Sequence, residues 1–141
     1  DEVEVRVTEL AKKVFRVRHA DPRLISGTTA NMAVYFALLA PGEIMTSVAL
    51  ANGAHISSAR FGAAGMRGVN TINYPFDVER MNIDVDGTAK LIKLVKPTVA
   101  AFGQSVYLFP TPLKDLQDVL REGNWMATFT VLDGSSMNCQ W

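Results

Sequence analysis

Short apolar runs that alternate with helical patterns restrict the fold of this chain more than any other feature. Two runs, Glu43 to Leu50 and Thr98 to Phe102, predict buried strands. Val69 to Tyr74 is strand-like, and the alternation from Met126 to Leu132 predicts a last strand. No internal repeat or linker divides the chain. Strands that alternate with helices on this scale are typical of an α/β domain with a mostly parallel sheet. We therefore predict one domain over residues 1–141, with a three-layer α/β/α fold.

Helical spacing and stop signals predict the elements that precede the first of these strands. Apolar residues from Val7 to Phe15 recur on one side, which predicts a surface helix lying over a core. Arg23 to Ile25 is a short apolar run and predicts a strand. Ala30 to Leu39 is apolar on nearly every side, which predicts a buried helix that ends before Pro41.

Two further helices are predicted in the second half of the chain. Asp84 or Asp86 is placed to cap a helix that ends before Pro97. Pro112 opens the other helix and Gly123 closes it. The side chains of this last helix that we expect to face the core are Leu113, Leu116, Val119 and Leu120.

Charge and composition argue against several classes of function. Fourteen basic and fourteen acidic residues balance, so no net field attracts nucleic acid or an anionic membrane. The apolar run from Met32 to Leu39 is shorter than the about 20 residues that cross a bilayer, and the acidic start from Asp1 to Glu4 is unlike a secretory signal. Cys139 is the single cysteine, so we predict no disulfide, a reducing compartment and a cytoplasmic protein. The histidines lie far from it in the sequence, and we predict no metal site.

Four polar clusters follow predicted strands, where ligands of parallel sheets collect. They are Ser26-Gly27-Thr28, His55, Ser105 and Asp133. The first joins a strand to a helix, where free N–H groups and hydroxyls favour an anion, although such a cluster is more often a plain helix cap. A loop His such as His55 stacks on aromatic cofactors or transfers protons, but is more often structural. Ser105 and Asp133 fit either turns or hydrogen bonds to a cofactor.

Read as a string, these clusters resemble one family, the serine hydroxymethyltransferases. The stretch from Ser26 to Glu43 resembles that family's segment after the phosphate loop, and Leu50 to His55 is similar to its Leu-Ala-His-Gly-Gly-His. Lys96 to Tyr107 resembles its Lys-Pro…Gly-x-Ser-Ala-Tyr segment, and Leu132 to Ser135 its strand-end Asp element. Order and spacing hold over nearly the whole chain.

The resemblance implies part of a fold-type-I large domain that binds pyridoxal phosphate (PLP). Ser26, Gly27 and Thr28 would then hold the phosphate, and His55 would stack on the pyridine ring. Ser105 would bond near the ring oxygen, and Asp133 would pair with the ring nitrogen. The family moves a one-carbon unit between serine and tetrahydrofolate, so an amino acid and a folate are the implied small-molecule partners.

The departures from the family pattern limit what this chain can do alone. Ser136 stands where the family has a His, and Asn52 and Ala54 replace a His and a Gly. No Lys stands where the Schiff base needs it, and that family segment would follow Trp141. We therefore expect no catalytic residue and no activity in this chain by itself. If PLP binds at all, we expect it to be held non-covalently. We also expect the chain to form a homo-oligomer or to associate with a complementing chain. A non-catalytic binding or assembly protein, another fold-type-I enzyme acting on amino acids, and an α/β domain with an unrelated ligand stay open as alternatives.

Overall fold

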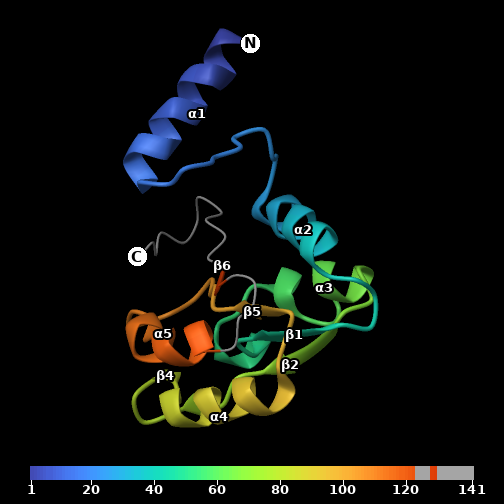
Figure 1. The fold of residues 1–141 in the computed structure, drawn as a ribbon, viewed down its shortest axis with the longest axis vertical. Coiled ribbons are helices and arrows are strands. Elements are labelled where there is room, and N and C mark those ends of the chain that lie inside the picture. The colour runs from blue at the N-terminus through green and yellow to red at the C-terminus, as the bar shows by residue number, and fades with distance from the viewer. Residues whose placement is uncertain (123–127, 130–141) are drawn as a thin grey trace.

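Parallel strands form the centre of the molecule. The structure is a computed structural model that describes residues 1–122 and 128–129. Its main sheet has the strand order β2-β1-β5-β6, and all neighbouring strands are parallel (Figure 1). The strands are β1 (Ile44–Ser47), β2 (Asn70–Asn73), β5 (Val99–Ala101) and β6 (Thr128–Phe129). In the register, Met45 lies beside Thr71 on one side and Val99 on the other. The predicted α/β fold with a mostly parallel sheet is confirmed.

Helices cover both faces of this sheet. They are α2 (Gly27–Leu38), α3 (Ala63–Met66), α4 (Val85–Val95) and α5 (Leu113–Glu122). Val99 and Ala101 of β5 pack in a cluster with residues of α2 and α3. Ala100 and Phe102 pack in a second cluster with residues of α4 and α5. Because successive side chains of a strand point to opposite faces, β5 is covered on both sides and the fold has three layers.

The first helix, α1 (Glu2–Phe15), does not lie over a core. Asp1 caps it and none of its residues is buried; Figure 1 shows it apart from the sheet, joined to α2 by residues 16–26. Val7, Leu10 and Val14 are 42%, 60% and 68% exposed. The prediction of a helix is confirmed, but the prediction that it covers a core is wrong. An amphipathic pattern identifies an apolar face without specifying what packs on it.

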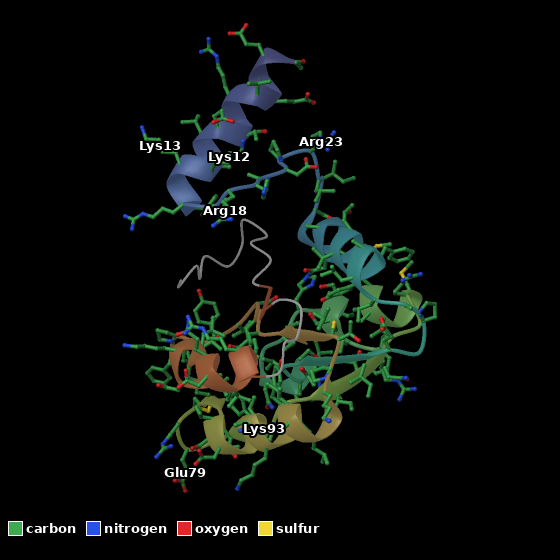
Figure 2. The ribbon with its side chains drawn as sticks, viewed as in Figure 1. Lys12, Lys13, Arg18, Arg23, Glu79 and Lys93 are labelled. Carbon is green, nitrogen blue, oxygen red and sulfur yellow. The ribbon has the colours of Figure 1, made fainter. Side chains whose placement is uncertain are left out.

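The basic residues near the end of α1 lie on its surface. Lys12 and Lys13 occupy the last turn, where positive charge favours the helix dipole. Figure 2 shows them with Arg18 at the end of α1 that leads into the connecting segment.

Two predictions in the segment that follows α1 are corrected. Residues 23–25 form no strand: a turn covers residues 22–23, a bend follows at residues 25–26, and Ile25 is 93% exposed. The carboxylate of Asp21 accepts hydrogen bonds from the backbone N–H and the guanidinium of Arg23, which favours a local turn over an extended run. The helix predicted at Ala30 to Leu39 is present as α2, but it is not buried all round. Only Asn31 and Tyr35 are buried, because one face of the helix packs towards the sheet while Phe36 on another face stays half exposed.

A hairpin between β2 and α4 was not predicted from the sequence. Its strands are β3 (Phe76–Asp77) and β4 (Asn82–Ile83), which pair antiparallel. The carboxylate of Asp77 stabilises the turn by accepting hydrogen bonds from the backbone N–H groups of Glu79 and Arg80.

The structure also decides which aspartate caps α4, because the Asp84 carboxylate accepts a hydrogen bond from the backbone N–H of Gly87. In the part of the chain that the structure describes, no helix is long and apolar enough to cross a membrane.

Candidate functional site

The sheet topology singles out the carboxyl ends of the strands β1 and β5 as a place for a ligand. The chain leaves β1 through α3 to reach β2, and leaves β5 through α5 to reach β6, on the opposite face and in the opposite direction (Figure 1). The connections that follow the neighbouring strands β1 and β5 therefore run to opposite sides of the sheet. In parallel sheets, ligands bind at the carboxyl ends of strands where the order reverses in this way. His55 follows β1 and Ser105 follows β5, so both predicted site residues belong to this point.

Gly53 holds the two loops together. Its carbonyl oxygen accepts the N–H of Ser105 at 2.8 Å and that of Val106 at 3.0 Å. The side-chain amide of Gln104 donates to the carbonyl of Asn52 at 3.1 Å. A side chain at Gly53 would collide with the Val106 carbonyl, and the backbone there has a φ of 96°. A glycine is therefore needed where the His55 and Ser105 loops meet.

A second set of contacts attaches helix α2 to the His55 loop. The Nδ1 atom of His55 accepts the backbone N–H of Ser57 at 3.2 Å and lies 2.7 Å from its hydroxyl. The Asn31 amide donates to the same hydroxyl at 2.6 Å, and Tyr35 and Ser58 form a parallel hydroxyl pair at 3.1 Å. Sequence reasoning singled out only His55 among these residues. The available signal was a polar residue, Asn31, inside an otherwise apolar helix.

Ser26 caps helix α2, as the plain structural interpretation predicted. Its hydroxyl accepts the N–H of Thr29 at 3.1 Å and also bonds to the Thr29 hydroxyl at 2.8 Å. Among the described residues, no hydrogen bond engages the N–H groups of Gly27 and Thr28 or the hydroxyl of Thr28. These donors lie at the positive end of the helix dipole, which suits a phosphate. No strand precedes them, which corrects that part of the prediction.

The last predicted site residue lies outside the described residues. Asp133 and the departing position Ser136 both follow residue 129, where the description ends. Over residues 1–122 and 128–129, no group of three His, Cys, Asp or Glu side chains is arranged to hold a metal ion. The structure thus brings together His55, Ser105 and, through Asn31, the helix that begins at Gly27.

Comparison with known proteins identifies the family of this chain. The family model of serine hydroxymethyltransferase matches residues 1–130. This chain belongs to the serine hydroxymethyltransferase family. The chain is 55% identical over 124 residues to the serine hydroxymethyltransferase of Picrophilus torridus, a match that covers 88% of this chain and 29% of that protein. With the Thermoplasma acidophilum enzyme the identity is 49% over 122 residues, covering 86% of this chain and 29% of the relative.

A third serine hydroxymethyltransferase extends the match along the chain. The protein of Pyrococcus horikoshii is 44% identical over 135 residues, which covers 96% of this chain and 31% of the relative. The chain therefore spans about 30% of the length of the serine hydroxymethyltransferases that it matches. The predicted site residues Ser26, Gly27, Thr28, His55 and Ser105 lie inside the family match, and Asp133 lies beyond it.

Proposed function

We propose that this chain forms the PLP-holding part of a serine hydroxymethyltransferase, which moves a one-carbon unit between serine and tetrahydrofolate. The observation that carries the proposal is the Asn31–Ser57–His55 contact chain, which ties the helix with open N-terminal donors to the loop at the reversal point of the sheet. When bound, PLP supplies an electron sink for bonds at the amino-acid α-carbon. The protein supplies binding and orientation.

The donors at the start of α2 fit the phosphate group of this cofactor. A phosphate dianion accepts several hydrogen bonds, and charge-assisted bonds from N–H and O–H groups are about twice as strong as neutral ones. Gly27 and Thr28 offer two N–H groups and one hydroxyl with no competing partner among the described residues. Ser26 contributes by capping the next N–H, that of Thr29, so that the helix begins where these donors are open.

The remaining roles follow from position at the same edge. His55 offers an imidazole face for stacking on the pyridine ring, and Ser105 offers a hydroxyl near the ring substituents. Asp133 is proposed as the acceptor for the protonated ring nitrogen, a role that also requires the strand before it to end at this edge. We also infer that the protein works in the cytoplasm as a homo-oligomer, supported by its single cysteine and by the exposed apolar face of α1.

A PLP titration of the full chain tests the cofactor site. We expect weak, reversible binding that inorganic phosphate competes away and that borohydride does not trap on any one Lys. Thr28→Val removes one charge-assisted hydrogen bond, so the dissociation constant should rise about tenfold. Thr8→Val is the matched control, because the Thr8 hydroxyl bonds only to the Glu4 carbonyl within α1.

Two results would contradict the cofactor site. One is PLP binding that responds neither to phosphate nor to Thr28→Val. The other is stoichiometric trapping of a single Lys, which would place the cofactor at a site other than the one formed by Thr28 and His55.

A further inference from the structure

We propose that Ser57 and Asn31 are positioning residues that set the tautomer of the His55 imidazole, with the lone pair on Nδ1 and the proton on Nε2. Both residues are buried, with exposed fractions of 0% for Ser57 and 9% for Asn31. They lie 26 positions apart in the sequence and meet only because α2 packs against the loop after β1. Neither residue carries a role in the resemblance described above.

One backbone N–H group, which can donate a hydrogen bond but never accept one, decides which atoms donate and which accept among Asn31, Ser57 and His55. The backbone N–H of Ser57 can only donate, and it points to Nδ1 of His55 at 3.2 Å. Nδ1 therefore presents its lone pair, and the proton of the neutral ring is on Nε2. His55 acts here as the N-cap of a single 3-10 turn, η2 (Ile56–Ser58).

The side-chain hydrogens then have only one consistent arrangement. The Ser57 hydroxyl lies 2.7 Å from an Nδ1 that accepts, so this hydroxyl donates its one proton to the ring. The hydroxyl oxygen must then accept from Asn31, which lies 2.6 Å away and presents its amide NH₂. The positions of the oxygen and nitrogen in the Asn31 amide are ambiguous by themselves. The backbone N–H of Ser57, which donates to Nδ1 of His55, decides them through the Ser57 hydroxyl.

This arrangement decides which part of His55 is left for a ligand. Nδ1 has two donors, whereas no described residue makes a hydrogen bond to Nε2. In this tautomer the ring offers a neutral π face and one N–H. A neutral face stacks on a protonated aromatic ring without the charge repulsion that an imidazolium would bring. That use of the ring rests on the proposed function, whereas the tautomer does not.

Long-range proton–nitrogen NMR of the full chain, without PLP, tests the assignment at a pH at which both histidines are neutral. The expected spectrum of His55 has a lone-pair signal at Nδ1 and a proton-bearing signal at Nε2. In Asn31→Asp the new carboxylate accepts the Ser57 proton, so the hydroxyl turns away from Nδ1 and the Nδ1–H fraction should rise. Ser57→Ala removes the hydroxyl donor and leaves the backbone N–H of residue 57 as the remaining donor to Nδ1, so the Nδ1–H fraction should rise there as well. Ser57→Thr, which keeps the hydroxyl, should retain the original spectrum.

His19 is the internal control, because it is exposed and lies outside this contact chain. Its signals should stay unchanged in every variant. A proton on Nδ1 of His55 in the unaltered chain would overturn the proposal, and this result needs no variant to fold. An unchanged His55 spectrum in folded Asn31→Asp and Ser57→Ala would overturn it as well. Because no cofactor is present, a failure of PLP binding is recorded separately and leaves this outcome readable.

Discussion

At the scale of single residues, Tyr74 couples the core to pH. Its side chain is buried, its hydroxyl lies 2.9 Å from the Thr46 hydroxyl, and its ring stacks on Phe102 with centroids 4.7 Å apart. Burial raises the pKa of Tyr74, and the hydrogen bond to Thr46 offsets this only in part. Burial raises the pKa of Tyr35 in the same direction. The folded protein thus keeps these protons at a pH at which the unfolded chain has lost them.

The free energy of unfolding should therefore fall at alkaline pH. Below the pKa of about 10 that a tyrosine has in the unfolded chain, the free energy of unfolding should not depend on the ionisation of these two tyrosines. Above that pH, each tyrosine should lower the free energy of unfolding by up to about 1.4 kcal/mol per pH unit. Tyr74→Phe should cost about 1 kcal/mol at neutral pH, because the buried Thr46 hydroxyl loses a partner. It should also reduce the alkaline slope, measured by urea unfolding at several pH values. An identical slope in both proteins would contradict this assignment.

Gly53 allows a sharper test of the junction between the His55 and Ser105 loops. Gly53→Ala should destabilise the fold by about 3 kcal/mol, because the new methyl group meets the Val106 carbonyl in addition to the positive φ. Gly42→Ala is the matched control: its φ of 89° is also positive, but nothing lies within 4 Å of the new atom. It should cost only about 1 kcal/mol. Equal losses in denaturant unfolding would show that the contact with Val106 is unimportant.

At the scale of elements, the cap of α4 shows how a local signal is selected. The sequence leaves Asp84 and Asp86 as alternatives, and the structure places Asp84 before the helix with its carboxylate 3.1 Å from the Gly87 N–H. Asp86 lies within the first turn. A carboxylate at the cap satisfies a backbone donor, whereas one inside the first turn only interacts with the dipole.

The two aspartates should therefore differ in their effect on stability. Asp84→Ala should lower the free energy of unfolding by about 1 kcal/mol, and Asp86→Ala by about 0.4 kcal/mol. Urea unfolding at one pH and ionic strength compares them directly. A larger loss of stability in Asp86→Ala than in Asp84→Ala would contradict the assignment of Asp84 as the cap.

At the scale of the whole molecule, α1 stands out among the described α-helices because none of its residues is buried. Val3, Val7, Leu10 and Val14 follow one another at spacings of four, three and four residues, the pattern of a coiled-coil seam, and all are exposed. A helix of this length is marginal in water without a partner, since most helix stability comes from packing. Another surface that covers this seam would stabilise α1.

We therefore expect the isolated chain to self-associate through α1. Light scattering should give a mass above the 15.4 kDa of one chain. Leu10→Glu places a charge in the seam and should return the mass to that of a monomer, with a loss of helical circular dichroism. Val5→Glu is the matched control, because Val5 is also exposed but lies outside the seam. A monomer in the unaltered chain at micromolar concentration would contradict the expectation.

The sequence by itself determined the parallel α/β architecture, the helix cap at Ser26, and the placement of His55 and Ser105 after strands. These features depend on apolar periodicity and on cap residues within a few positions of one another, so they can be read locally. Tertiary structure alone decided that the apolar face of α1 stays exposed. It also decided that Asn31 reaches Ser57, 26 residues away, and that Gly53 joins the two loops of the site. Such contacts depend on how helices and loops pack on the sheet, which no local pattern specifies.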